Sequence, residues 1–157
     1  MTFTVEPIGV VHSARTGRSD EYWGAVESTI ELDERFSSEA LTGLGEFSHL
    51  EVVFLLHGID ESEIETKARH PRNNPAWPKI GIFAQRGARR PNRIGVSRCA
   101  LLRVEGRTLY VRGLDAIDET PVLDIKPYIR EFGPAGDVRQ PPWATEVMER
   151  YYDINEV

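Results

Sequence analysis

The residues that could carry chemistry concentrate between Gly81 and Ser97, where the sequence reads GIFAQRGARRPNRIGVS. An apolar run leads there into a loop with four arginines, and a second apolar run follows. A guanidinium group binds carboxylates and phosphates through paired N–H donors and stacks on bases. Gly87 and Gly95 let a ligand approach the backbone, and loops between rigid strands often carry function. The stretch is therefore a candidate site for an anionic ligand, with a tight turn and solvated arginines as the structural alternative.

A second dense stretch, Asp118 to Tyr128, reads DETPVLDIKPY. If it forms a strand, Asp124, Lys126 and Tyr128 share one face, because successive side chains in a strand alternate. An acid, an amine and a phenol on one half-apolar strand need either partners or a function. Asp124 is a candidate for acid–base chemistry, and Asn92 in the arginine loop is a candidate hydrogen-bond acceptor for an amino group. A structural ion pair between Asp124 and Lys126 is the alternative.

Other classes of reactive site find little support in the sequence. The single cysteine, Cys99, excludes an internal disulfide and a multi-cysteine zinc site, and a buried structural role is favoured for it. The four histidines lack the short spacing of metal ligands, so we expect no metal; they are His12, His49, His57 and His70. Phosphate-loop and dinucleotide fingerprints are missing.

Charge is distributed unevenly along the chain. The net charge of −6 over 157 residues would by itself argue against a nucleic-acid partner. Residues 66–104, however, contain no acidic residue and ten basic ones. These are Lys67, Arg69, Arg72, Lys79, Arg86, Arg89, Arg90, Arg93, Arg98 and Arg103. This basic window predicts a local positive face on an otherwise acidic protein, unless its arginines pair with the acidic flanks.

Short apolar runs alternate with turn residues, which is typical of a β-rich fold. The pattern predicts strands at residues 3–12, 26–32, 49–57, 79–84, 94–104, 108–114 and 122–129, and helices at 33–42 and 143–152. Residues 105–107 are expected to form a hairpin turn around Gly106. No long amphipathic helix separates the strands, so parallel βαβ units are not expected. We expect a mainly β protein, a single-domain antiparallel β-barrel with one or two short helices; a sandwich is the alternative.

Length and hydropathy set further bounds. A chain of 157 residues is suited to one domain with its own core. No apolar run approaches the ~20 residues that cross a bilayer, and the first eleven residues lack the pattern of a signal peptide. We therefore expect a cytoplasmic protein with no membrane contact.

Five blocks of the sequence stand in one order: PIGVVHS (7–13), GLGEFSHL (43–50), GIFAQR (81–86), RPNRIGVS (90–97) and TPVLDIKPY (120–128). In these blocks the chain resembles the TsaA-like family of S-adenosylmethionine-dependent methyltransferases, which are β-barrels. Characterised members methylate the exocyclic amine of threonylcarbamoyladenosine beside the tRNA anticodon. The resemblance implies a methyltransferase barrel at residues 1–135. Residues 136–157 would then be a linker and a short helix that packs on the barrel or on a partner subunit.

The resemblance also implies which residues bind the methyl donor, S-adenosylmethionine. Family positions correspond here to His57, Gly58, Arg86, Val96, Asp124, Ile125, Lys126 and Pro127, and less closely to the loop Glu21, Tyr22 and Trp23. An aromatic side chain of that loop could face the sulfonium cation. Arg86 is expected to pair with the carboxylate of the donor.

The acceptor implied by the resemblance is a tRNA anticodon loop, and the expected assembly is a homodimer with donor sites near the subunit boundary. Asn92 is expected to orient the acceptor amine, and Asp124 to assist proton transfer or donor binding. The RNA- or substrate-binding residues are expected to be Arg89, Arg90 and Arg93. Two alternatives remain open: a methyltransferase of the same fold that acts on a small anionic molecule, and a non-enzymatic barrel that binds nucleotides or RNA.

Overall fold

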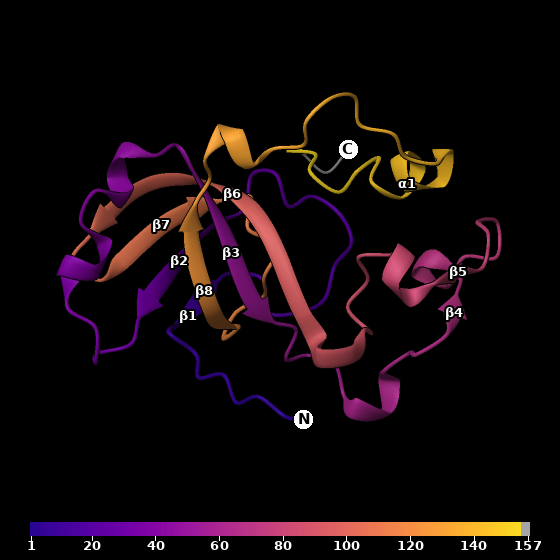
Figure 1. Cartoon of the computed structure of the whole chain (residues 1–157), viewed down its shortest axis with the longest axis horizontal. Helices are drawn as coiled ribbons and strands as arrows, with labels where there is room; N and C mark the ends of the chain where they lie inside the picture. The colour runs from indigo at the N-terminus through magenta and orange to yellow at the C-terminus, as the bar shows by residue number, and fades with distance from the viewer. Residues whose placement is uncertain (155–157) are drawn as a thin grey trace.

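Six antiparallel strands close into a barrel in the order β1-β2-β7-β6-β3-β8 (Figure 1). The computed structural model describes residues 1–154. The barrel strands are β1 (Gly9–Ser13), β2 (Glu27–Leu32), β3 (His49–Leu55), β6 (Ile94–Glu105), β7 (Thr108–Arg112) and β8 (Pro121–Pro127). The predicted fold class, an antiparallel β-barrel with few short helices, is confirmed.

The remaining elements lie largely beside the barrel. A small two-stranded sheet pairs β4 (Ala68–Arg69) with β5 (Ile80–Gly81), and the one α-helix of residues 1–154 is α1 (Pro142–Val147). Figure 1 shows β4, β5 and α1 together on one side of the molecule, with the barrel on the other. Short 3₁₀ turns occupy Ser38–Leu41, Leu44–Glu46, Glu61–Glu63, Pro71–Asn73, Ile82–Ala84, Pro91–Arg93 and Arg130–Phe132.

Four predicted elements were wrong in kind or extent. The strand predicted at 3–12 begins only at Gly9, and the helix predicted at 143–152 ends at Val147. The helix predicted at 33–42 is reduced to the 3₁₀ turn Ser38–Leu41, in which Leu41 alone is buried. One buried side chain is too little apolar surface to stabilise an isolated helix of that length. The strand predicted at 79–84 pairs only over Ile80–Gly81, because the chain turns into a 3₁₀ helix at Ile82.

Side chains that alternate along the strands fill the barrel, with register shifts in β6 and β8. In β3, Leu50, Val52 and Phe54 point inward and are at most 3% exposed. They pack with residues from the other strands, among them Val11, Ile30, Leu109 and Val111. The intervening residues of β3 face outward, so the strand has one core face and one outer face.

The hairpin between β6 and β7 turns where the sequence predicts. Glu105 pairs with Thr108, and Gly106 has a φ of +60°. This left-handed conformation carries little steric penalty for glycine, which explains its place in the tight turn.

The C-terminal segment folds back onto the loop that precedes β2. Tyr22 N–H donates to the Arg150 carbonyl, and Trp23 N–H donates to the Tyr151 carbonyl, at 2.9 and 2.8 Å. At the end of α1, just before this segment, the Arg72 guanidinium donates to the carbonyl of Val147. These bonds fix the segment that follows α1 beside the start of the chain's second strand.

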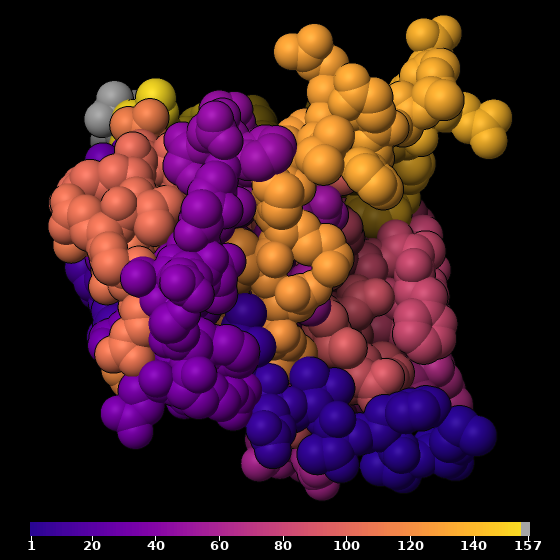
Figure 2. Space-filling model, turned by 60° about the vertical axis from the view of Figure 1, so that its left-hand side comes forward, coloured from indigo at the N-terminus to yellow at the C-terminus, as the bar shows by residue number. Residues whose placement is uncertain are grey.

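The N-terminal residues and the segment that follows β8 lie at opposite edges of one face of the molecule. Figure 2 shows the N-terminal residues, in indigo, along one edge and the segment that follows β8, in orange, standing out at the other. Within residues 1–154, no helix has both the length and the apolar character needed to cross a membrane.

Gly95 lies where β6 packs closely against β3, and mutation of Gly95 tests this close packing. A Cβ at this position would lie 2.5 Å from Cε2 of the core residue Phe54. We expect Gly95→Ala to lower the free energy of unfolding by about 1–3 kcal/mol through overpacking, as measured by urea denaturation. Gly45→Ala is the control, since nothing lies within 4 Å of its Cβ position. Equal stability of the two variants would contradict the packing described.

Candidate functional site

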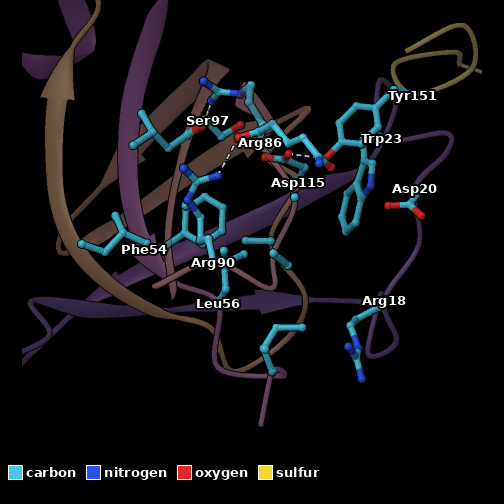
Figure 3. A pocket seen from close by; sticks show the side chains of 18 of the residues that line it. Arg18, Asp20, Trp23, Phe54, Leu56, Arg86, Arg90, Ser97, Asp115 and Tyr151 are labelled. Carbon is cyan, nitrogen blue, oxygen red and sulfur yellow. Dashed lines mark hydrogen bonds between the residues drawn. The ribbon is translucent and has the colours of Figure 1, made fainter. Parts of the chain in front are cut away.

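A cavity of about 850 Å³ opens beside the start of β6. Its walls come from segments far apart in the sequence: the loop before β2, the end of β3, the loop 83–90, the segment after β7 and the C-terminal segment. Figure 3 shows Trp23, Phe54, Arg86, Asp115 and Tyr151 around it. Barrel closure and the returning C-terminal segment together create this space, so no single stretch of sequence could indicate it.

Several residues predicted to bind the donor or the substrate line this cavity. They are Trp23, His57, Gly58, Arg86, Arg90 and Val96. The other predicted residues do not belong to its lining, namely Glu21, Tyr22, Arg89, Asn92, Arg93, Asp124, Ile125, Lys126 and Pro127. Six of the fifteen residues that the sequence suggested for the site thus lie around one cavity within one chain.

Three arginines of the basic window are held by backbone carbonyls. Arg86 donates to the Val96 carbonyl at 2.7 Å, Arg90 to Gln85 at 2.8 Å and Arg93 to Ile59 at 2.7 Å. Within residues 1–154 none of the three lies in a salt bridge with a carboxylate. Their positions are fixed while their charge stays available to an anion.

Four other arginines of the basic window follow the structural alternative. Arg72, Arg89, Arg98 and Arg103 each lie within 4.0 Å of a carboxylate; for example, Arg89 Nη2 is 3.3 Å from Glu63 Oε1. Exposed pairs of this kind contribute little stability. The basic window therefore divides into a paired part and an unpaired part, and the unpaired part borders the cavity through Arg86 and Arg90.

The loop before β2 presents Trp23 to the cavity. Trp23 is 2% exposed, and its indole N–H donates to the Ser19 carbonyl at 2.9 Å. The Arg15 guanidinium lies 4.5 Å from the ring centre and also donates to the carbonyls of Glu21 and Tyr22. Glu21 and Tyr22 thus serve here to hold the loop that carries Trp23.

The predicted residues 124–127 of β8 lie on the barrel wall and do not line the cavity. Asp124 Oδ2 accepts from Lys126 Nζ at 2.5 Å, and Asp124 Oδ1 accepts from the Ile125 N–H. The hydrogen bond and charge of Asp124 raise the pKa of Lys126. Across the sheet, Asp124 pairs with Val53, which pairs with Val96, so these three share the outer face. Ile125 instead packs against the core.

Asn92 occupies a tight turn between the cavity and the start of β6. It is exposed, with a φ of +63°, in the 3₁₀ turn Pro91–Arg93. Asparagine is among the residues that tolerate this left-handed conformation best. The turn therefore gives Asn92 a structural role in addition to the orienting role that stays a prediction.

Sequence reasoning missed much of the cavity lining, including the polar pair Asp115 and Tyr151. The Tyr151 hydroxyl donates to Asp115 Oδ2, a contact between residues 36 positions apart. Burial is the main cause that raises the pKa of Tyr151, and the charge of Asp115 adds to it. The only local signal was an acidic residue between two apolar ones, Leu114 and Ala116, both of which are buried.

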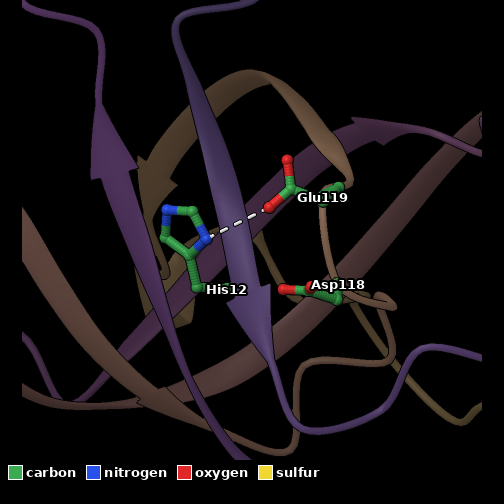
Figure 4. Close-up of side chains that lie close together, drawn as sticks. All are labelled: His12, Asp118 and Glu119. Carbon is green, nitrogen blue, oxygen red and sulfur yellow. Dashed lines mark ion pairs between the residues drawn. The ribbon is translucent and has the colours of Figure 1, made fainter.

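A separate cluster brings His12 close to Asp118 and Glu119 (Figure 4). His12 Nδ1 lies 3.5 Å from Glu119 Oε1, and its Nε2 lies 3.2 Å from Glu31 Oε2. Asp118 Oδ1 accepts from the Ser13 N–H at 2.9 Å. Each side chain thus already has a protein partner, and the cluster is adequately described as ion pairing around the β1–β8 junction.

Similarity to known proteins adds to this geometry. Residues 12–133 match the family model described as the tRNA-methyltransferase O N-terminal domain, which is most of the chain. The chain belongs to this family. The sequence resemblance to TsaA-like proteins is thereby confirmed, and the matched region includes every barrel strand except the first three residues of β1.

Relatives of this family differ in length. The chain is 42% identical over 102 residues to the human tRNA (adenine(37)-N6)-methyltransferase, covering 65% of the chain and 23% of that protein. It is 36% identical over 140 residues to a probable S-adenosyl-L-methionine-binding protein of Methanothermobacter thermautotrophicus, covering 87% and 97%. A crystal structure of TrmO from Pseudomonas aeruginosa superposes with a TM-score of 0.73 at 34% identity, covering 91% and 62%. The chain therefore spans less than two thirds of several relatives, including the human one.

Cys99 provides a test of the buried barrel wall. It is 2% exposed, and burial, with a contribution from Asp115, raises its thiol pKa to about 12. At pH 8 the thiol is therefore protonated and shielded, so we expect no alkylation by iodoacetamide in the native protein. Mass spectrometry should show full modification after unfolding in urea. Rapid modification of the native protein would contradict this placement.

Proposed function

We propose that this chain transfers a methyl group from S-adenosylmethionine to the exocyclic amine of an adenine in tRNA. The observation that carries the proposal is the convergence of Trp23, His57, Gly58, Arg86 and Val96 on one cavity. The family resemblance assigns these residues to the donor, and relatives of the family are named as tRNA adenine methyltransferases. We extend the proposal to threonylcarbamoyladenosine beside the anticodon as the acceptor nucleotide.

The cavity residues suit the chemical groups of the donor. S-adenosylmethionine supplies a methyl group on a sulfonium cation, together with a carboxylate and an adenine ring. The Arg86 guanidinium, unpaired with any carboxylate of residues 1–154, matches the donor carboxylate. The Arg15 guanidinium lies over one face of the Trp23 indole at 4.5 Å, and in this proposal the opposite face meets the sulfonium cation. In this proposal the protein contributes mainly by positioning the two reactants.

The unpaired part of the basic window suits a nucleic-acid acceptor. Arg90 and Arg93 donate to backbone carbonyls and have no carboxylate partner within residues 1–154, while the neighbouring Arg89 is half-buried and pairs with Glu63 at 3.3 Å. An anticodon loop exposes unstacked bases that a protein can reach without opening a duplex. We propose that these arginines bind its phosphates, in a protein that works in the cytoplasm.

We further propose a homodimer that uses the outer face of β3, β6 and β8. On this face Ile94 is 42% and Val96 is 38% exposed, beside half-buried Val53 and Leu55. A second copy placed there would cover these apolar side chains and bring Asp124–Pro127 close to a donor site. The division into a barrel (1–135) and a C-terminal segment (136–157) is part of the same proposal.

Calorimetry with S-adenosylmethionine tests donor binding. We expect Arg86→Ala to weaken the affinity about 10- to 100-fold, because a charge-assisted hydrogen bond to the carboxylate is lost. Arg103→Ala is the matched control, since Arg103 pairs with Glu105 at 2.6 Å. A wild-type protein that releases no heat with the donor would contradict the proposal and favour a non-enzymatic barrel.

Salt dependence of tRNA binding tests the acceptor. Each phosphate contact to a single strand contributes roughly −0.7 to the slope of log affinity against log salt concentration. We expect replacement of Arg89, Arg90 and Arg93 by alanine to flatten that slope by about 2. Arg112→Ala is the control, because Arg112 lies on β7 beside Glu27. Affinity independent of salt in the wild type would favour a small-molecule acceptor instead.

A further inference from the structure

Two buried polar atoms in the cavity wall lack a hydrogen-bond partner within residues 1–154: Asp115 Oδ1 and Ser97 Oγ. Both residues line the same cavity (Figure 3). Ser97 is 4% exposed. Leaving a buried acceptor or donor unpaired costs roughly 1–3 kcal/mol, and more for a charged group. Two such atoms beside one cavity therefore indicate that a bound molecule completes their hydrogen bonds.

The Asp115 carboxylate is fixed in orientation. Its Oδ2 accepts from the Tyr151 hydroxyl, which comes from the C-terminal segment. That segment is itself anchored by the hydrogen bond from Trp23 N–H to the Tyr151 carbonyl. Asp115 makes no salt bridge within residues 1–154, so its negative charge has no cationic partner there. The free oxygen is thus held in place and is a strong acceptor.

The hydrogen-bonding capacity of these two atoms limits which ligand can bind to them. A carboxylate oxygen only accepts, so the ligand must present an N–H or O–H donor to Asp115. The Ser97 hydroxyl can donate, so a ligand acceptor beside that N–H would complete the pair. Adenine carries this combination, an exocyclic N–H next to the ring nitrogen N7. Carboxylates do pair with exocyclic amines in base recognition.

We propose that Asp115 binds the exocyclic N–H of the adenine that is methylated and takes up its proton, with Tyr151 as the residue that positions Asp115. The inference rests on the proposed function of the cavity. It assigns the proton acceptor to a residue that the resemblance did not assign, in place of Asp124, which is occupied by Lys126 and the Ile125 N–H. Tyr151 lies outside the matched residues 12–133, so this positioning contact is supplied by the C-terminal segment.

The step balances in atoms and charge. The amine nitrogen forms a bond to the methyl carbon, the C–S bond breaks, and its electron pair stays on sulfur. The N–H proton passes to Asp115 Oδ1 and from there to water. One positive sulfonium and one negative carboxylate are thereby converted into two neutral groups, which is favourable where the dielectric constant is low. A nearby carboxylate is useful because the lone pair of an adenine amine is delocalised and the amine is a weak nucleophile.

A binding experiment without donor tests the contact directly. Two anticodon-loop RNAs are compared by filter binding, one with adenine and one with purine, which lacks the amino group, at the acceptor position. We expect the wild type to prefer adenine about tenfold or more, since the purine RNA leaves Asp115 unpaired. Asp115→Asn is expected to lose most of this preference. Asp118→Asn, in the same loop and still able to accept from the Ser13 N–H, should retain it.

Single-turnover methyl transfer supplies the second measurement. We expect Asp115→Asn to slow the transfer about 100-fold while the donor affinity, measured by calorimetry, changes less than about threefold. Tyr151→Phe should slow it by a smaller factor and have no further effect when Asp115 is already Asn. Tyr110→Phe is the tyrosine control, because Tyr110 lies on β7 under Arg103. Thermal melting checks that each variant is folded. If Asp115→Asn does not fold, Tyr151→Phe still tests the proposal.

The outcomes separate this inference from the proposed function. A wild type that neither binds the donor nor methylates RNA overturns the proposed function itself. A wild type that methylates RNA while both variants match its rate overturns the role of Asp115 alone. A large loss of donor affinity in Asp115→Asn would assign the carboxylate to the adenine of the donor, and it too overturns the proposal.

Discussion

The structure depends on the closure of the six-stranded sheet by β1 and β8. Gly9 pairs with Val122 and Val10 with Pro121, and hydrogen bonds from Ile8 to Val122 and from Val11 to Thr120 extend the contact. This closure fixes the end of β3, the start of β6 and the segment after β7 at one rim. The cavity forms at that rim, and the C-terminal segment completes its wall. Every functional proposal above rests on this arrangement.

Charge at the rim follows from the same arrangement. The guanidinium groups of Arg86 and Arg90 donate hydrogen bonds to backbone carbonyls. These bonds hold the two side chains in position, and their positive charges are not neutralised. Asp115 keeps one oxygen free in a buried wall of the same cavity. A site with a fixed cation and a fixed anion is suited to a ligand that carries both signs and to an acceptor that offers an N–H group. Buried charges without partners are costly, which argues for a ligand rather than for a purely structural role.

Local sequence patterns predicted the features that depend on neighbours along the chain. The alternation of residues 26–32 predicted the one-sided burial of β2, and Gly106 predicted the hairpin turn, whereas the continuous apolar run of β3 hid its outer face. The arginine loop was recognised as a site because its residues are close in sequence. The sequence did not indicate Asp115 and Tyr151, because their contact joins a loop to a segment 36 residues later. A tyrosine at helical spacing is also more typical of a packed core than of a functional site. The position of Asp124 relative to the cavity also depends on strand order, which composition does not encode.

Nucleoside analysis of tRNA would show whether the proposed methyl transfer to an adenine takes place. Purified protein would be incubated with S-adenosylmethionine and tRNA isolated from a strain that lacks the corresponding gene, and the digested nucleosides would be examined by mass spectrometry. We expect one added methyl group on the exocyclic amine of the modified adenosine beside the anticodon. Donor binding by calorimetry without any methylated nucleoside in the tRNA digest would contradict it.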